Sequence, residues 1–500
     1  MTDDMITYNF ITYHLICYSR SINKGDIRVR PKVKYFVNRG RELELLSLMI
    51  TRGDKILIKG RRGIGKSVLA LKVLEEVEGQ GFKGVYINCS TVTRGSDLLR
   101  QMAEELCLKD VDVGRLDNKT ALENFFREVS ERGVNVIVLD EFTNLFRTLG
   151  RKREFGNVTN FAAVLRGCIM DCGAAVIATS SSLAEIRKII RKARILARTF
   201  DFILNLGPLD FNNSLGLISL MEREYGWKIP DDVKDRIVIL ADFVPFYVEC
   251  LTKAYALYGD LDEALRMEFT EGTLAEYFFS LYEDLNPTER LVIYNLAIGR
   301  KKYEDLESTI GESDLPQMLS DLIERDLISK VFISRKNVFY VAKDRTFASW
   351  VLFTTTPQMA KDIELFKRVS TIGFEALVRE TLGALGKQIR VKDALGRELV
   401  LGPFKYVGMG KSRYGQIDVL AIDFEGRTLL GECYFGTDVP KRKIEQLEKH
   451  LDEYPHSRLV IFHKGGVSSE AAEILKEKRI YLVDLKVLGN IRKNTPLHPF

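Results

Sequence analysis

The sequence has no long apolar run and little that resembles a targeting segment. None of the apolar stretches in its 500 residues approaches the roughly 20 residues that a membrane-spanning helix requires. The stretch from Asn9 to Tyr18 is apolar but short, and it lacks a basic leader and a small-residue cleavage site. We therefore expect no membrane association, no signal peptide and a cytoplasmic location.

The sequence also has few residues of the kinds that build disulfide or zinc sites. Its seven cysteines form no C-x-x-C pair, and with the five histidines they form no cluster of zinc spacing. Cys168 and Cys172 lie four residues apart on an expected helix, where buried thiols are the ordinary interpretation. This usage is typical of a reducing compartment and argues against a disulfide-stapled fold.

The length and charge of the chain indicate how many domains it has and which kind of partner it binds. A chain of 500 residues corresponds to about three domains, and a hydrophobic fraction of 46% is enough for sizeable cores. The net charge is only +5, and most of that excess falls within residues 371–500. A basic excess in one segment points to nucleic acid as a partner of that segment.

The strongest signal is a glycine-rich phosphate-binding loop in its usual context. An apolar strand over 56–58 leads into Gly60-x-x-x-x-Gly65-Lys66-Ser67, and we expect a helix from Val68 to about Val77. Backbone N–H groups at the helix start would wrap the β-phosphate of a nucleoside triphosphate, while Lys66 reaches the β- and γ-phosphates and Ser67 ligates Mg²⁺. The residues expected to contact the nucleotide are Gly60, Arg61, Arg62, Gly63, Ile64, Gly65, Lys66, Ser67 and Val68.

Two acids follow an apolar strand some seventy residues later. The run over 135–142 ends in Asp140 and Glu141, and the carboxyl ends of parallel strands meet at one edge of a sheet. We expect Asp140 to hold the Mg²⁺ ion and Glu141 to polarise the attacking water, with Lys66 as a further catalytic residue.

A later run, over 174–182, ends in hydroxyl residues. Thr179 lies where a sensor of the γ-phosphate would be expected. The alternative is that these hydroxyls cap the next helix, because Ser and Thr favour that position. A further strand is expected over 202–206.

These motifs resemble those of the archaeal AAA+-type ATPases of the STAND group. That group combines them with a segment like Phe36-Val-Asn-Arg39-Gly-Arg41-Glu42-Leu43. The resemblance implies an ATPase core over 34–210 after an extension over 1–33, and a helical lid over 211–285. It also implies that Phe36 and Arg39 lie near the adenine. Arg198 would be an arginine finger, which requires a homo-oligomer, or alternatively a surface charge. The lid start resembles the family's at Pro245, but Asp242 and Phe243 replace its glycines.

The pattern over 286–355 is typical of a winged helix. Three short helical segments precede two strands joined by a polar turn. A DNA reader places its third helix in the major groove, but here that helix carries Asp314, Asp321 and Glu324 against Arg325 alone. This charge favours a connector or a protein-docking role over sequence-specific DNA binding.

Residues 371–500 resemble the restriction-endonuclease-like PD-(D/E)XK fold. The run Gly415-Gln-Ile-Asp418 followed by Gly431-Glu432 matches the two acidic strands of that fold, which implies that Asp418 and Glu432 share a metal ion and act in catalysis. Glu375 matches a further acidic position of related enzymes. Tyr434 replaces the usual lysine, for which Lys441 or Lys443 would have to substitute.

The fold class that we predict is therefore α/β: a P-loop AAA+-like parallel-sheet domain with a helical lid, a winged helix and a restriction-endonuclease-like domain. Two functions remain open. In the first, ATP turnover is coupled to a metal-dependent nuclease acting on DNA. In the second, the chain is a regulatory ATP switch whose C-terminal domain binds a protein partner or DNA without cleaving it. No transporter signature precedes Asp140, and no kinase acceptor motif is present.

Overall fold

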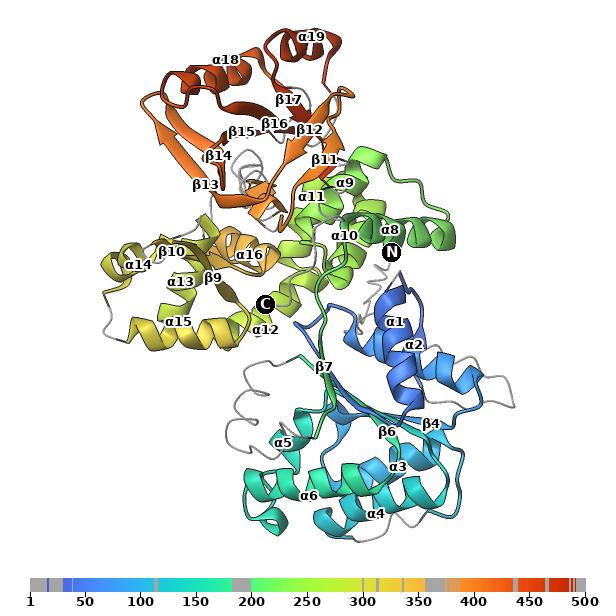
Figure 1. Ribbon diagram of the computed structural model, residues 1–500. Coiled ribbons are helices and arrows are strands. Elements are labelled where there is room, and N and C mark those ends of the chain that lie inside the picture. Colours follow the sequence, from blue (N-terminus) through green and yellow to red (C-terminus); the bar gives the residue numbers. More distant parts are fainter. Residues whose placement is uncertain are drawn as a thin grey trace, which may run out of the picture. The chain divides into compact units, whose positions relative to one another are not determined.

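The computed structural model describes most of the chain. The described residues are 16–17, 30–37, 39–111, 116–181, 199–298, 301–311, 314–334, 337–355, 374–375, 378–379, 381–383, 385–434, 439–463, 467–484, 487–488 and 491. Internal contacts divide the chain into two units, residues 1–207 and 208–500 (Figure 1). Among the described residues, no helix combines the length and the hydropathy that crossing a bilayer demands.

A five-stranded parallel sheet forms the centre of the first unit. Its strands follow the order β4-β5-β6-β3-β7. Their bounds are β3 Lys55–Lys59, β4 Gly84–Asn88, β5 Val136–Asp140, β6 Ala175–Ser180 and β7 Phe202–Asn205. The predicted strands are therefore confirmed. The short strands β1 (Ile16–Cys17) and β2 (Lys32–Val33) pair separately.

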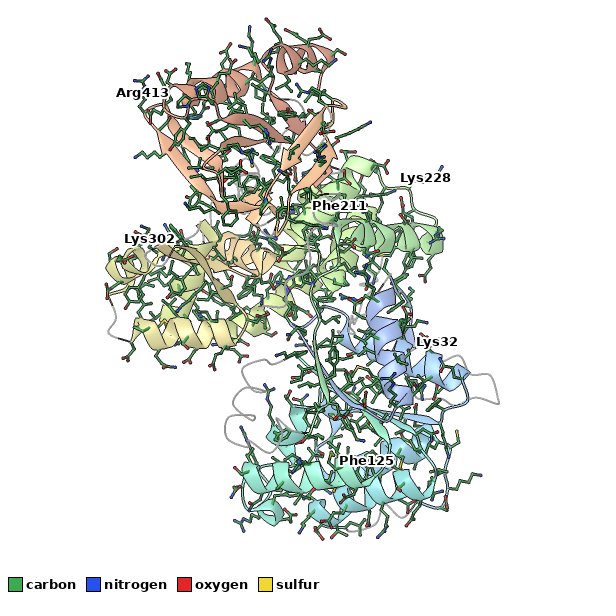
Figure 2. The ribbon with its side chains drawn as sticks, viewed as in Figure 1. Lys32, Phe125, Phe211, Lys228, Lys302 and Arg413 are labelled. Carbon is green, nitrogen blue, oxygen red and sulfur yellow. The ribbon has the colours of Figure 1, made fainter. Side chains whose placement is uncertain are left out.

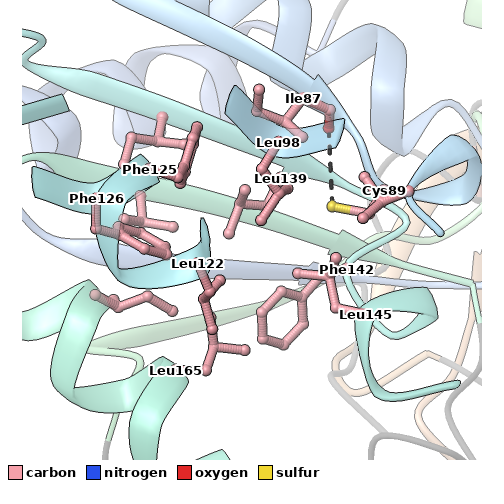
Figure 3. Close-up of a cluster of buried hydrophobic side chains, with 14 of the residues drawn as sticks. Ile87, Cys89, Leu98, Leu122, Phe125, Phe126, Leu139, Phe142, Leu145 and Leu165 are labelled. Atoms are coloured by element: carbon pink, nitrogen blue, oxygen red, sulfur yellow. Dashed lines mark hydrogen bonds between the residues drawn. The ribbon is translucent and has the colours of Figure 1, made fainter. Parts of the chain in front are cut away.

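Helices cover both faces of this sheet, which explains why its central strands are apolar throughout. Helices α1 (Gly40–Thr51) and α2 (Lys66–Gly79) lie on one face, and α3 (Gly95–Glu105), α4 (Asn118–Glu131) and α6 (Val158–Asp171) on the other (Figure 1). Alternate residues of the strands, such as Leu139, pack against α3, α4 and α6 in one buried cluster (Figure 3). Phe125 of α4 lies within this cluster (Figures 2 and 3).

Helix α4 was missing from our prediction. Its signal was present in Asp117, whose carboxylate accepts hydrogen bonds from the backbone N–H groups of Lys119 and Thr120. An aspartate in this position is a common N-cap. A short helix, α5 (Asn144–Thr148), follows β5.

The second unit begins with helices, as predicted for 211–285. They are α8 Phe211–Tyr225, α9 Asp231–Leu240, α10 Pro245–Tyr258, α11 Leu261–Thr270 and α12 Thr273–Glu283. Asp242 and Phe243, which replace glycines of the resembled family, have φ angles of 49° and 60°. This is the left-handed region that glycine normally fills. The carboxylate of Asp242 is paired with Arg345, which lies 2.6 Å away.

Three helices and a small sheet follow. The helices are α13 Pro287–Ile298, α14 Tyr303–Ile310 and α15 Leu315–Glu324, and the strands are β9 Ile328–Ser334 and β10 Asn337–Ala342. These are the elements predicted for 286–355. Two elements were not predicted: β8 (Lys301–Lys302), which pairs with β10, and helix α16 (Arg345–Thr355).

The last part of the chain contains a mixed five-stranded sheet. Its order is β13-β14-β15-β16-β17, with the first two pairings antiparallel and the last two parallel. The strands are Phe404–Ser412, Gly415–Asp423, Thr428–Tyr434, Arg458–His463 and Tyr481–Val483. Helices α18 (Lys441–Lys449) and α19 (Ser469–Glu477) accompany it, and β11 (Ile389–Lys392) pairs with β12 (Glu398–Leu401). A 3-10 turn at His450–Asp452 follows α18 directly.

The close approach of α3 and α4 predicts the effect of a glycine substitution. A Cβ atom on Gly95 would lie 2.6 Å from the backbone oxygen of Asn118 and 2.8 Å from the Cβ of Ala121. We expect Gly95→Ala to lower the free energy of unfolding by about 1–3 kcal/mol, because the two helices must separate. Thermal unfolding measures this effect. Gly79→Ala is the matched control, since open space surrounds Gly79. Equal melting temperatures of the two variants would contradict the prediction.

Candidate functional site

The loop between β3 and α2 has the conformation that a phosphate-binding loop requires. Gly63 and Gly65 have φ angles of 80° and 94°, which other residues rarely adopt. Gly65 is the left-handed cap before α2, so the helix begins at Lys66 with its free N–H groups directed at the loop. Gly60 lies so close to the backbone that a Cβ there would be 2.5 Å from the oxygen of Leu206.

Lys66 is buried beside hydrogen-bond acceptors. Its side-chain nitrogen donates to the hydroxyl of Ser181 at 2.8 Å and to the backbone oxygen of Arg61 at 3.1 Å. Burial lowers the pKa of Lys66, while the carboxylates of Glu141 and Asp140 oppose that shift. The lysine is thus held at the base of the loop by two neutral oxygens.

The Asp140 carboxylate accepts three side-chain hydrogen bonds. Ser67 donates to it at 2.7 Å, Tyr86 at 2.7 Å, and Thr179 is the third donor. Burial, and then the neighbouring Glu141, raise the pKa of Asp140. The Ser67 hydroxyl and the Asp140 carboxylate therefore lie together, as the oxygen ligands of a Mg²⁺ ion would. Sequence reasoning missed Tyr86, whose position at the centre of β4 suggested only a core residue.

Glu141 has a backbone conformation unusual for glutamate. Its φ angle is 52°, and its backbone N–H donates to the Thr179 hydroxyl at 3.0 Å. Its carboxylate accepts a hydrogen bond from Ser181. Thr179, the expected phosphate sensor, is fully buried and bonded to Asp140 and Glu141. The hydroxyl that contacts Lys66 belongs instead to Ser181, two residues further along the chain.

The remaining predicted nucleotide contacts have different surroundings. Arg39 is buried, and its guanidinium donates to the backbone oxygens of Ile64 at 3.1 Å and Gly207 at 2.8 Å. It therefore connects the segment before α1 to the phosphate-binding loop. Phe36 is half-buried. Arg198, the predicted arginine finger, lies outside the described residues.

Comparison with known proteins identifies this part of the chain. Residues 51–172 match the family model described as an AAA domain. No curated protein matches the chain. The chain therefore carries an AAA-type ATPase domain, and this part of it binds and hydrolyses nucleotide.

Several solved structures are similar to this chain at low sequence identity, and the TM-score of the first supports a shared fold. The Walker-type ATPase of Pyrococcus abyssi is 17% identical, with a TM-score of 0.51 over 63% of this chain and 96% of that one. The ORC2 protein of Aeropyrum pernix, in ADPNP and ADP complexes, is 14% identical, with a TM-score of 0.49 over 67% and 96%. The RuvB Holliday junction branch migration motor of Thermotoga maritima is 14% identical, with a TM-score of 0.34 over 62% and 94%.

A second group of charged side chains lies in the C-terminal sheet. Asp418 on β14 and Glu432 on β15 are buried on adjacent antiparallel strands. The Asp418 carboxylate accepts from the backbone N–H of Cys433 at 2.9 Å. Lys443 of α18 donates to one oxygen of Glu432 at 2.7 Å, and the other oxygen of Glu432 is buried without a hydrogen-bond partner among the described residues.

Glu375 and Arg379 belong to the same group. Arg379 donates to the backbone oxygen of Asp418 at 2.7 Å and to the Glu375 carboxylate at 3.3 Å. Burial, and then the charge of Asp418, raise the pKa of Glu375 to about 7, and the same causes raise the pKa of Glu432 to about 7. Carboxylates whose pKa values are raised by burial, and further by a neighbouring negative charge, often mark functional sites.

Tyr434, which stands where the resembled fold has a lysine, does not contact the acids in the way that lysine would. Its ring stacks on that of His463 with 5.8 Å between ring centroids, while Lys443 approaches Glu432 from α18. Of the two lysines considered from the sequence, Lys443 thus lies at the acids, and Lys441 is exposed on the same helix. Within the described ranges, no group of three or more His, Cys, Asp and Glu side chains is arranged to hold a metal ion.

The raised pKa of Glu375 predicts a pH dependence of stability. Folding raises the pKa of the Glu375 carboxyl from 4.5 to about 7. Between these pH values the carboxyl ionises in the unfolded chain but stays protonated in the folded protein, so the free energy of unfolding falls as pH rises. Glu375→Gln removes this loss. Between pH 5 and pH 8, we expect the unfolding free energy of the variant to rise relative to wild type by about 2 kcal/mol. Thermal or urea unfolding at both pH values measures it, and a pH-independent difference would contradict it.

Proposed function

We propose that the chain couples Mg²⁺-dependent ATP hydrolysis to a metal-dependent nuclease site in residues 371–500, with DNA as the substrate. The observation that carries this proposal is the group Asp418, Glu432 and Lys443. Two buried carboxylates on adjacent strands meet an ammonium group there, although the sequence lacks the lysine at its usual place.

In the ATPase domain, the proposed roles follow the contacts. The Ser67 hydroxyl and the Asp140 carboxylate would hold Mg²⁺, and Lys66 would bind the β- and γ-phosphates. Glu141, at the end of β5, would orient and polarise the attacking water. Phe36 and Arg39 near the adenine, Thr179 as a sensor, and Arg198 as an arginine finger in a homo-oligomer remain part of the proposal.

In the C-terminal domain, the proposed chemistry is hydrolysis of a phosphodiester. A divalent metal ion held by Asp418 and Glu432 would polarise the phosphate and the water. Lys443 carries a positive charge, since contact with Glu432 raises its pKa despite burial, and that charge would stabilise the developing negative charge of the phosphate. The Glu432 oxygen that has no partner in the described part of the chain would be a ligand for such an ion.

The proposed domain organisation accords with these roles. An extension over 1–33 precedes the ATPase core at 34–210, a helical lid at 211–285 and a winged helix at 286–355, and a restriction-endonuclease-like domain covers 371–500. The mixed order β13-β14-β15-β16-β17, with both acids on the antiparallel pair β14 and β15, supports the last assignment.

A second candidate function is a regulatory switch of the STAND type. In that case ATP binding would rearrange the lid and the winged helix, and the C-terminal domain would bind a protein partner or DNA without cleaving it. Two observations favour it. Tyr434 occupies the usual lysine position, stacked on His463, and α15 carries Asp321 and Glu324, which would repel phosphate.

The ATPase roles predict two distinct variants. Lys66→Ala should abolish ATP binding, because no other ammonium group lies at the described part of the loop in its place. Glu141→Gln should bind ATP normally and lower kcat by roughly a hundredfold or more, because the general base is lost. Fluorescent-nucleotide binding and phosphate release measure the two effects. Normal turnover by Glu141→Gln would refute the role proposed for Glu141.

The nuclease proposal is tested on labelled single-stranded, duplex and branched DNA with Mg²⁺ or Mn²⁺, with and without ATP. We expect wild type to cleave at least one substrate, and Asp418→Ala and Lys443→Met to lower the rate at least roughly a hundredfold. Lys441→Met, from the same helix, is the matched control and should retain activity. Intact ATPase activity without any cleavage would favour the switch.

A further inference from the structure

Asp418 lies at an irregularity of the C-terminal sheet. The register between β13 and β14 shifts between Gly408 and Gly410, so that one residue of β13 stands opposite two residues of β14, Asp418 and Val419. The ladder between β14 and β15 begins at Val419. Asp418 is therefore absent from the register of both ladders. A bulge of this kind disrupts the ladder locally and redirects a side chain, and such bulges are frequent beside active sites.

Two donors hold Asp418 at this bulge. Its backbone oxygen accepts from Nη1 of Arg379 at 2.7 Å, and its carboxylate accepts from the backbone N–H of Cys433 at 2.9 Å. The same Nη1 atom of Arg379 donates to the Glu375 carboxylate at 3.3 Å. Because a guanidinium Nη carries two protons, one nitrogen satisfies both oxygens at once. Arg379 therefore links two acidic residues that lie on different segments of the domain.

Arg379 lies in a helical segment before the sheet, and apolar residues anchor that segment. Phe374, Val378 and Leu382 recur at intervals of four residues and are fully buried. This spacing places them on one face of a helix, which they fix against the domain core. The side chains of Glu375 and Arg379 are themselves largely buried. The guanidinium thus reaches β14 from a fixed base, so its bond to Asp418 restrains the backbone there.

From these contacts we propose that Arg379 is a positioning residue of the metal site in the C-terminal domain. It holds the backbone of Asp418 at the bulge, so that the carboxylate is preset toward the divalent ion that it would share with Glu432. It also keeps Glu375 beside that carboxylate. In this role Arg379 contacts the acids and not the ion. The inference rests on the nuclease function proposed above, because that function supplies the ion.

Arg397 allows this role to be separated from a merely structural one. It donates to the Asp393 carboxylate, four residues before it, and to the backbone oxygen of Leu475 at 3.3 Å. This repeats the pattern of Arg379, in which one guanidinium joins a carboxylate four residues away to a distant backbone oxygen. Asp393 also accepts from the backbone of Leu482 on β17, so the contacts of Arg397 belong to the other edge of the sheet. Loss of Arg397 should therefore lower stability without changing metal affinity.

The experiment titrates the whole 500-residue chain with Mn²⁺, without nucleotide, and measures the free ion by electron paramagnetic resonance. Wild type should show a site that is lost in Asp418→Ala, a variant that also reveals Mn²⁺ bound elsewhere in the chain. We expect Arg379→Met to raise the Kd of this site roughly ten- to a hundredfold, the range for residues that orient metal ligands. Arg379→Lys should recover most of the affinity, because one ammonium carries enough protons for both oxygens. Arg397→Met is the matched control and should bind Mn²⁺ as wild type does.

Three results would overturn the inference. They are an unchanged Kd in Arg379→Met, equal losses of affinity in Arg379→Met and Arg397→Met, and an Arg379→Lys variant as impaired as Arg379→Met. Thermal unfolding shows whether each variant folds, and Arg379→Gln, with the same expected rise in Kd, replaces Arg379→Met if that variant does not. A wild type without an Asp418-dependent Mn²⁺ site would refute the proposed nuclease and the inference together. An unchanged Kd in Arg379→Met, beside such a site in wild type, refutes the inference alone.

Discussion

The ATPase site depends on one buried carboxylate. Asp140 accepts hydrogen bonds from Ser67 at the start of α2, from Tyr86 on β4 and from Thr179 on β6. It thereby connects the phosphate-binding loop to three strands at the edge of the sheet where the nucleotide would lie. Burying a carboxylate is costly unless donors surround it, and these three donors offset the cost of burying Asp140. The same donors keep one of its oxygens beside Ser67, where a metal ion would bind.

Much of the first unit was predictable because local sequence signals coincided with the three-dimensional arrangement. The loop glycines, the apolar strands and the two acids after β5 could be read directly, since parallel strands place their carboxyl ends at one edge. The different hydrogen-bond partners of Thr179, Ser180 and Ser181 could not be predicted from the sequence. Successive residues of a strand point to opposite faces, but β6 ends at Ser180, and the direction of the next hydroxyl depends on the irregular turn that follows. Tyr86 was missed because an aromatic residue in a buried strand usually belongs to the core.

In the C-terminal domain the sequence indicated the two acids but not their surroundings. The hairpin pattern predicts that Asp418 and Glu432 lie on adjacent strands. Which of Lys441 and Lys443 reaches them depends on how α18 packs. Since α18 buries Ile444 and Leu447, Lys443 lies at the edge of the buried face and Lys441 points outward. Arg379 was not predicted either, because its bond to the backbone of Asp418 joins residues 39 positions apart. Short unpredicted strands such as β8 have too few residues to show any periodicity.

Arg39 has a mechanical consequence for the ATPase unit. Its guanidinium bonds at once to the backbone of Ile64, inside the phosphate-binding loop, and to that of Gly207, the last residue of the unit. Two points separated by more than a hundred residues of chain are thereby linked through one planar, rigid group. A displacement of the loop would therefore strain or break the bond that the same guanidinium makes to Gly207. Arg39 thus couples the position of the phosphate-binding loop to the backbone at the end of the unit.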